Sequence, residues 1–181
     1  MKYFKKIVGE KVYLSPINEE DVEIYVKWMN DFGVTDGLGS SHLVTTLNGE
    51  KDWIINNNKN GELQFAIIDK KNDTLIGNCG FNDINYLRQI AEIGIFIGEE
   101  KNRNNGYGSD AILLLLRYGF EYLNLNNICL KVYSFNERAI NAYKNCGFKE
   151  FGRRHQVLPL KGNLYDDVYM EILRSDYYKD K

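Results

Sequence analysis

A strand, a glycine-bearing turn, a helix and a second strand follow one another in the middle of this chain. Glu92–Gly98 is a mainly apolar segment of strand type, and Arg103–Gly108 is polar and contains two glycines. A helix is expected from Ser109 to about Leu123, and a strand at Asn127–Ser134. This order is that of a βαβ unit, in which the two strands are parallel. The sheet must therefore contain a parallel pair.

The segments up to Gly98 predict a strand, two helices and then an antiparallel meander. A first strand is expected at Lys11–Ile17, followed by a helix that Asn18 caps, and a second helix begins at Thr46. Asp31–Val44 contains three glycines and is expected to be an irregular loop. The remaining expected elements are a hairpin of Glu62–Asp69 and Thr74–Ile84, a strand at Ile90–Gly98, a helix at Asn136–Asn145, and strands at Phe148–Val157 and Leu164–Leu173.

The composition is that of a globular protein with a nearly neutral surface. The chain has 44% hydrophobic residues, only two prolines and no linker-like stretch, so we expect one domain over residues 1–181. A net charge of −2 gives no reason to expect nucleic acid or an anionic membrane as a partner. No apolar run approaches the roughly 20 residues that span a bilayer. We expect a cytoplasmic protein, because no apolar segment of signal-peptide type follows Met1–Lys6.

The cysteines and histidines argue against a disulfide framework and against a zinc site. Three cysteines lie far apart, at Cys79, Cys129 and Cys146, and only two histidines accompany them. No Cys-x-x-Cys pair is present, although such a pair is typical of structural zinc sites. We therefore expect reduced thiols and no metal.

The turn at Arg103–Ser109 has the features of an anion-binding site. A helix start presents backbone N–H groups without helical partners and the positive end of the helix dipole, and both attract phosphate oxygens. Gly106 and Gly108 would let the backbone approach a diphosphate closely. The turn is neither a P-loop nor a dinucleotide fingerprint, because the lysine of the first and the three-glycine spacing of the second are absent. A plain turn before a helix is the alternative interpretation.

A second motif begins at Asn136 and ends at Phe148. Asn136 is expected to cap a helix whose face carries Ala139, Ile140 and Tyr143, and Gly147 is expected to end it. Taken alone, Tyr143 would be interpreted as a core aromatic residue.

Together, and in this order, the two motifs resemble those of the GNAT N-acetyltransferase superfamily. The acetyl-CoA signature Arg/Gln-x-x-Gly-x-Gly/Ala is met by Arg103, Gly106 and Gly108. The pattern Asn-x-x-Ala-x-x-x-Tyr-x-x-x-Gly-Phe is met by Asn136, Ala139, Tyr143, Gly147 and Phe148.

Within the superfamily, the chain is similar to the branch that acetylates ribosomal-protein N-termini and spermidine, the RimJ/RimL type. Asn104 departs from this branch, which commonly has Gly there, and Asn105 stands in place of a usual Lys or Arg. The lost cation is expected to weaken pyrophosphate binding, whereas a cradle of backbone amides does not depend on side chains. The supporting segments are Leu14–Pro16, Trp28–Asp31, Glu92–Gly94 and Gly162–Asp167.

The resemblance implies a fold and a cosubstrate. The fold is α/β (α+β), with a mixed, mostly antiparallel sheet of six to seven strands and about four helices. Acetyl-CoA would lie in a splay between the two central strands. The residues implied to bind it are Ile95, Phe96, Ile97, Arg103, Asn104, Asn105, Gly106, Tyr107, Gly108, Ser109, Asn136 and Arg138.

The resemblance also implies catalytic roles for Tyr143 and Glu92. Tyr143 would protonate the departing thiolate, and because a phenol has a pKa near 10 against about 8–9 for a thiol, this transfer must be concerted or assisted. Glu92 would be the base, directly or through water, and a surface ion pair with Arg or Lys is its alternative interpretation.

Four other residues are weaker candidates in the sequence. His42 and His155 could each take a proton, but a lone histidine is usually incidental. Asp31 and Asp36 lie in the segment that walls the acceptor pocket in this family, where they would contact a cationic amine or remain solvated loop carboxylates.

The implied function is acetyl transfer to a primary amine, with the acceptor left open. The acceptors to consider are a protein N-terminus, a small amine such as a polyamine, an amino sugar and an aminoglycoside. A non-catalytic acyl-CoA-binding module is the alternative of a different class. A homodimer is expected because dimers are frequent in the family, and neither nucleic acid nor a membrane is an expected partner.

Overall fold

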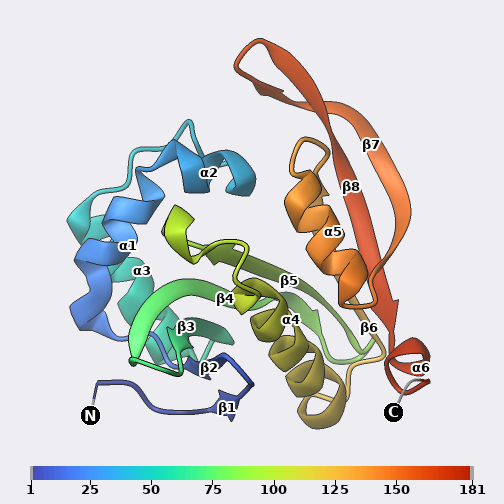
Figure 1. Ribbon diagram of the computed structural model, residues 1–181, viewed down its shortest axis with the longest axis horizontal. Helices are drawn as coiled ribbons and strands as arrows, with labels where there is room; N and C mark the ends of the chain where they lie inside the picture. The colour runs from blue at the N-terminus through green and yellow to red at the C-terminus, as the bar shows by residue number, and fades with distance from the viewer. Residues whose placement is uncertain (1, 180–181) are drawn as a thin grey trace. The chain divides into compact units, whose positions relative to one another are not determined.

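The computed structural model describes residues 2–179 (Figure 1). Met1, Asp180 and Lys181 lie outside the described residues, and so do the two ends of the domain expected over residues 1–181. The chain groups into two compact units, one made of residues up to Gly80 with Ile95–Leu114 and the other of Phe81–Gly94 with the residues from Leu115 onwards.

The first unit contains an antiparallel group of strands. β1 (Ile7–Val8) pairs with β2 (Val12–Ser15), and β2 pairs with β3 (Gln64–Asp69) in a register that sets Tyr13 opposite Ile68. β3 pairs in turn with the start of β4 (Thr74–Asn85). The expected first strand and the expected hairpin are confirmed, and the very short β1 is an addition. Every residue of β2 is buried, because both faces of this strand are covered.

Three helices belong to the same unit. α1 (Val22–Met29) follows a short 3₁₀ turn whose N-cap is Asn18. α3 (Leu47–Asn60) begins directly after its N-cap, Thr46, where the second helix was expected to begin. The irregular loop expected at 31–44 is wrong over half its length, because α2 (Phe32–Leu38) forms there. Asp31 caps its first turn and Gly39, in the left-handed conformation, ends it, so two of the features typical of a loop are the caps of a helix.

The core of the first unit is rich in aromatic side chains. Tyr13, Tyr25 and Trp28 are almost completely buried beside Ile54 and Ile68. Trp28 also explains the glycine after the strand β5 (Ile90–Ile97), because a Cβ atom on Gly98 would lie 2.0 Å from the indole ring. The close packing of this ring fixes the chain at the point where β5 ends.

The second unit contains the parallel pair and a long hairpin. The first residues of β5 pair in parallel with β6 (Asn127–Tyr133), setting Ile90 opposite Asn127 and Glu92 opposite Cys129. β6 pairs with β8 (Asn163–Leu173), which pairs with β7 (Lys149–Leu160) in the long orange and red hairpin of Figure 1. α5 (Glu137–Asn145) connects β6 to β7, and α6 (Arg174–Tyr177) follows β8.

The order of hydrogen-bonded strands in the sheet is β1-β2-β3-β4-β5-β6-β8-β7. The expected mixed, mostly antiparallel α/β class is confirmed, and so is the βαβ unit, whose helix is α4 (Tyr107–Arg117). The described residues form eight strands and six α-helices, more than the six to seven strands and about four helices expected. The helix expected from Ser109 to about Leu123 begins two residues earlier and ends in a π-helical turn at Tyr118–Tyr122.

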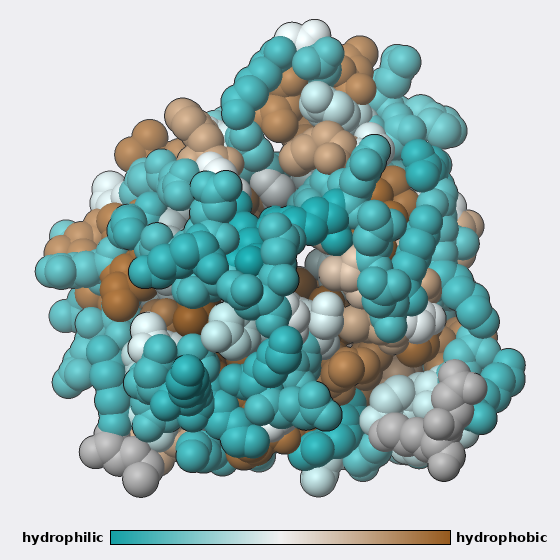
Figure 2. Space-filling model, viewed as in Figure 1, coloured by the Kyte–Doolittle hydropathy of each residue, from teal (hydrophilic) through white to brown (hydrophobic). Residues whose placement is uncertain are grey.

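Hydrophilic side chains cover most of the face shown in Figure 2, and the buried side chains are mainly aliphatic and aromatic. No helix within residues 2–179 is both long enough and apolar enough to cross a membrane.

Candidate active site

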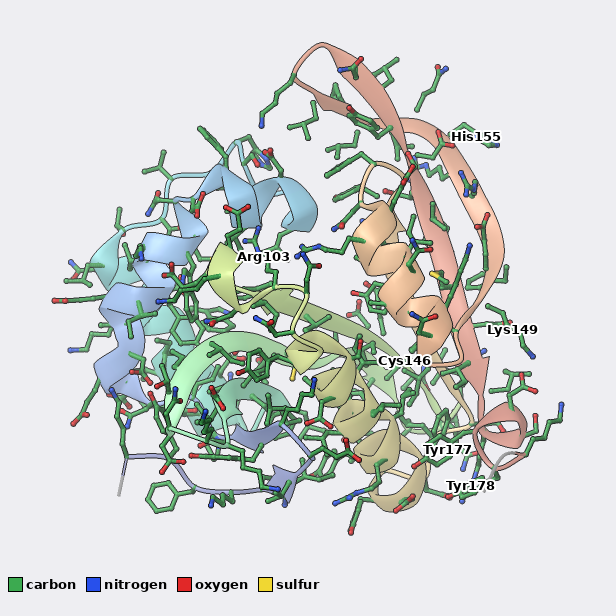
Figure 3. All side chains as sticks on the ribbon, in the orientation of Figure 1. Arg103, Cys146, Lys149, His155, Tyr177 and Tyr178 are labelled. Atoms are coloured by element: carbon green, nitrogen blue, oxygen red, sulfur yellow. The ribbon has the colours of Figure 1, made fainter. Side chains whose placement is uncertain are left out.

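The turn between β5 and α4 is held against the end of β5 by Arg103 (Figure 3). The guanidinium of Arg103 donates hydrogen bonds to the backbone carbonyls of Ile97, at 3.2 Å, and Gly98, at 3.0 Å. These two hydrogen bonds fix the turn at Arg103–Gly108. The side chain of Arg103 therefore stabilises the conformation of this turn, which is the expected cradle of backbone amides. Ile95, Phe96 and Ile97, the strand residues expected to bind the cosubstrate, are half-buried in the same unit.

Two residues of the turn have left-handed backbone conformations. Asn104 has φ = 62° and Gly106 has φ = 80°. Asn is among the few residues other than Gly that adopt this region readily, which explains why Asn104 can replace the Gly common in the RimJ/RimL branch. A Cβ atom on Gly106 would also lie 2.8 Å from the ammonium nitrogen of Lys11. The conformation of the turn therefore depends on these two positions.

Lys11 brings a positive charge to the turn from the β1–β2 connection. Its Nζ atom donates a hydrogen bond to the backbone carbonyl of Asn105 at 2.7 Å. The resemblance had suggested that Asn105 costs the site a cation, and the structure supplies one at the same place from another element. Sequence reasoning missed Lys11, since nothing in the local pattern links residues so far apart in the chain.

Asp110 joins the first turn of α4 to the β1–β2 connection. Its carboxylate accepts hydrogen bonds from the backbone N–H groups of Glu10, Lys11 and Val12, at 3.3, 2.8 and 2.9 Å. The hydroxyl of Tyr107, the first residue of α4, donates a hydrogen bond to the carboxylate of Asp69 at 3.1 Å. The helix start is therefore anchored to β2 and β3, which fixes the direction in which its backbone N–H groups point.

The residues of this turn fit the diphosphate of an acyl-CoA. The first N–H groups of an α-helix have no partner within the helix, and the helix dipole places partial positive charge there. A Cβ atom on Gly108 would meet only Ile97, at 3.9 Å, so this side of the turn is open to a ligand. With Lys11 beside it, the cradle combines amide donors, a cation and an open glycine surface. Ser109, the last residue of this turn that was expected to bind the cosubstrate, lies in the first turn of α4.

Glu92 lies in the second unit, near the end of the parallel pairing. It is half-buried and forms no ion pair within residues 2–179, so the surface ion pair that was its alternative interpretation is not formed. Burial raises the pKa of Glu92, Lys131 lowers it, and the carboxylates of Asp83 and Asp167 raise it further. A carboxylate with a raised pKa is a stronger base than an exposed one.

Tyr143 lies on α5 in the same unit and is 7% exposed. Its ring packs edge to face against Phe148, with 5.9 Å between the ring centroids. Burial raises the pKa of Tyr143, so its hydroxyl stays protonated at neutral pH. The ring is thus a core residue, as the alternative interpretation held, and the role of the hydroxyl stays a prediction.

The helix that carries Tyr143 is capped as predicted. The side chain of Asn136 accepts a hydrogen bond from the N–H of Ala139 at 3.2 Å, and Gly147 has φ = 97°. Arg138, another residue expected to bind the cosubstrate, is exposed in the first turn of this helix.

The four weaker candidates, Asp31, Asp36, His42 and His155, lie in two segments, the region around α2 and the strand β7. Asp31 accepts a hydrogen bond from Gly33 N–H as the cap of α2, and Asp36 accepts one from the hydroxyl of Ser41 at 2.6 Å. His155 is exposed on β7, with Nδ1 3.2 Å from Asp166 Oδ2 (Figure 3), and His42 is exposed in the segment after α2.

A cavity of about 280 Å³ lies in the first unit, and Phe96 is the one residue of its lining that the sequence led us to expect in the site. Its walls include the rings of Tyr25, Trp53 and Phe96 and the carboxyl of Glu50. Phe96 belongs to β5, so the cavity reaches the strand that is expected to bind the cosubstrate. Glu50 carries no sequence signal of its own, since a Glu in the first turn of a helix is ordinary.

An α/β fold with a βαβ unit and an amide cradle at its helix start is suited to bind the diphosphate of an acyl-CoA. The model of the acetyltransferase (GNAT) domain family matches residues 11–149, and the chain belongs to this family. Acetyl-CoA is the cosubstrate of GNAT acetyltransferases, so the expected cosubstrate and the expected enzyme class are confirmed.

Several proteins that are similar to this chain are named N-acetyltransferases. The N-acetyltransferase p20 of Bacillus licheniformis is 31% identical, covering 93% of this chain and 96% of that protein. A spermidine N(1)-acetyltransferase of Vibrio cholerae is 35% identical over 65% of this chain and 67% of that protein. The crystal structure of spermidine N-acetyltransferase from Vibrio cholerae with CoA and spermine has a TM-score of 0.83 at 26% identity, covering 92% of this chain and 98% of that chain.

Proposed function

We propose that this acetyltransferase transfers the acetyl group of acetyl-CoA to a primary amine, either a protein N-terminus or a small amine such as a polyamine. The observation that carries the proposal is the turn at Arg103–Gly108, with its two left-handed residues and the ammonium of Lys11. The similarity to spermidine acetyltransferases favours a small cationic acceptor over an amino sugar or an aminoglycoside.

The residues that hold the cosubstrate have different tasks in this proposal. The backbone N–H groups at the start of α4 and Lys11 bind the diphosphate, and Arg103 keeps the turn in place. Ile95, Phe96 and Ile97 offer backbone groups to the pantetheine arm on β5, and Asn136 and Arg138 contact the same cosubstrate from α5.

The chemical step requires two proton transfers. A bond forms between the amine nitrogen and the acetyl carbonyl carbon, and the bond from that carbon to sulfur breaks. Glu92 accepts a proton from the amine, directly or through water, and its raised pKa suits this task. The hydroxyl of Tyr143 gives its proton to the departing sulfur and is reprotonated by solvent. Because burial raises the pKa of this hydroxyl, the proton must move as the carbon–sulfur bond breaks.

The wider assignment extends this proposal. We place the chain in the RimJ/RimL branch, as a cytoplasmic homodimer whose residues 1–181 form one N-acetyltransferase domain. The continuity of β4, β5 and α4 from one compact unit into the other supports a single domain. Neither nucleic acid nor a membrane is a partner in this assignment.

A thiol-release assay with a panel of amines tests the proposed reaction. The panel contains spermidine, a peptide with N-terminal alanine, glucosamine and an aminoglycoside, each with acetyl-CoA in excess. Acceptor-dependent release of CoA with spermidine or the peptide is the expected result. If acetyl-CoA binds and no amine increases thiol release, the chain is a non-catalytic acyl-CoA-binding module. If only the sugars react, the amino-sugar alternative holds.

A further inference from the structure

The cavity in the first unit has the walls of a cation-binding site. The rings of Tyr25 and Trp53 come from α1 and α3, with centroids 6.2 Å apart, and the ring of Phe96 comes from β5. Aromatic faces attract ammonium groups, more strongly where water is excluded. Met29 and Leu43 add apolar surface, so the cavity suits a ligand with both methylene groups and a cation.

Glu50 differs from the other buried carboxylates of the described residues. Asp21 contacts the ammonium of Lys2 at 2.6 Å, Asp69 accepts the hydroxyl of Tyr107, and Asp167 lies 4.0 Å from the ammonium of Lys131. Glu50 is only 9% exposed, yet its carboxyl has neither a hydrogen bond nor an ion pair within residues 2–179. Glu50 is one of the residues that line the cavity.

A buried carboxylate without a partner is costly for the folded protein. Burial disfavours its charged form, and removing it from water is offset only when a cation or several donors replace the water. Such a residue points to a ligand that supplies the missing charge. The opposing interpretation is a neutral, protonated Glu50 that serves packing alone, and the two differ in how the protein responds to an added cation.

We propose that Glu50, with the ring of Trp53, binds a second ammonium group of the acceptor, one that does not react. The preferred acceptors are then diamines and polyamines rather than monoamines or uncharged amino compounds. The inference rests on the proposed amine acetylation and assigns its specificity to a residue outside the acetyl-CoA motifs. Glu50 is a specificity-determining residue here and takes no part in proton transfer.

The first test compares acceptors that differ in their second charge. Initial rates are measured for the whole protein with 1,4-diaminobutane, spermidine and n-butylamine at saturating acetyl-CoA. We expect Glu50→Gln to raise KM for the diamine and for spermidine by roughly tenfold or more, which is the loss of one charged contact. KM for n-butylamine and for acetyl-CoA should stay the same. Asp52→Asn, an exposed carboxylate on the same helix, is the matched control and should change none of these constants.

The second test needs no turnover and separates the subsite from the proposed function. Spermidine alone should raise the Tm of the wild-type protein and of Asp52→Asn, and should leave that of Glu50→Gln unchanged. Trp53→Leu keeps the carboxylate, removes one ring and should give an intermediate shift. These shifts would support the subsite even if no acceptor were acetylated.

Two outcomes would overturn the inference. If Glu50→Gln lowers kcat equally for mono- and diamines, the residue acts in folding or chemistry rather than in recognising the second charge. If the diamine KM and the spermidine-dependent Tm shift are both unchanged in Glu50→Gln, the second ammonium group binds elsewhere. A wild type that acetylates n-butylamine as well as the diamine would leave the proposed function standing and refute the subsite.

Discussion

The left-handed conformation of Gly106 makes this residue the most sensitive position of the cradle. Valine cannot easily adopt φ = 80°, and its side chain would stand between the backbone amides and a diphosphate. The Cβ atom would meet the flexible end of Lys11, which can move, so the fold should survive. We expect Gly106→Val to abolish acetyl-CoA binding in titration calorimetry while far-UV circular dichroism stays unchanged.

Gly162 supplies the matched control for this substitution. Its φ is 81°, a Cβ atom there would have no neighbour within 4 Å, and it lies in the β7–β8 turn. Gly162→Val should carry a similar backbone strain, on the order of 1–3 kcal/mol, and leave acetyl-CoA affinity intact. Equal losses of affinity in the two variants would mean that strain, and not the cradle, explains the effect.

The hydroxyl of Tyr143 can be removed without removing its ring. Tyr143→Phe keeps the contact with Phe148, so the Tm should change little. If the hydroxyl protonates the leaving thiolate, kcat should fall by roughly 10²–10⁴-fold, and KM for acetyl-CoA should change much less. An unchanged kcat would leave Tyr143 as a core aromatic residue, and a raised KM with normal kcat would make its hydroxyl a binding group. Tyr122→Phe, at an exposed tyrosine, controls for the substitution itself.

Glu50 should make the stability of the protein depend on pH. Burial raises its pKa above the ordinary 4.5, so the folded state holds this proton more tightly than the unfolded chain does. Its favourable contribution is therefore complete below pH 4.5 and is lost as the pH rises through the raised pKa. Tyr25 is the other titratable group lining the cavity, and burial raises its pKa, so it stays neutral in this range.

The measurement is urea unfolding of the wild type and Glu50→Gln at pH 4 and pH 8, without amine. The free energy of unfolding of Glu50→Gln relative to the wild type should be higher at pH 8 than at pH 4. A difference that does not change with pH would show that Glu50 has the same pKa in the folded and the unfolded chain.

At the scale of elements, the sequence predicts local structure well where caps and apolar periodicity agree. Asn136, the buried face with Ile140 and Tyr143, and Gly147 define α5 almost to the residue. α2 fails the same reasoning because its glycines resemble those of a loop. The helix forms because Asp31 caps it and because Val34 and Thr35 are buried, and that burial depends on tertiary packing.

The residues of the candidate site also differ in whether a local pattern predicts them. The motifs predict the turn before α4 and the helix of Tyr143, because each is a local pattern. The roles of Lys11 and Glu50 could not be predicted from the sequence, because each depends on residues that are distant in the chain. Lys11 meets Asn105 across the fold, and Glu50 differs from any other first-turn carboxylate only in what surrounds it.

Asp110 holds two elements together and should be needed for both stability and cosubstrate affinity. Asp110→Ala leaves the N–H group of the buried Val12 without its acceptor, at an expected cost of about 1–3 kcal/mol in the free energy of unfolding, whereas water can replace the acceptor of the exposed Lys11 N–H. Because Lys11 then loses its anchor beside the turn, KM for acetyl-CoA should also rise. Urea unfolding and initial rates measure the two effects, with Asp52→Ala as the exposed control. A loss of stability with unchanged KM would separate the β1–β2 connection from the cradle.

At the scale of the whole molecule, the candidate residues are shared between two compact units. The turn, Lys11 and the cavity belong to the first unit, and Glu92, Asn136 and Tyr143 belong to the second. β4, β5 and α4 each continue from one unit into the other. A chain built in this way should unfold in one cooperative step, because neither unit keeps its strands intact without the other.

Acetyl-CoA tests this cooperativity together with the assignment of the cosubstrate. A ligand that binds only the folded state stabilises it by about 2.7 kcal/mol when its concentration is 100 times Kd. For a chain of this size, that stabilisation corresponds to a rise in Tm of roughly 5–10 °C. Differential scanning calorimetry should show one transition that moves upward as a whole. A single transition that does not move at millimolar acetyl-CoA would contradict the cosubstrate assignment. Two transitions, of which acetyl-CoA shifts only one, would mean that the units unfold separately and that the cosubstrate is bound by the residues of one unit alone.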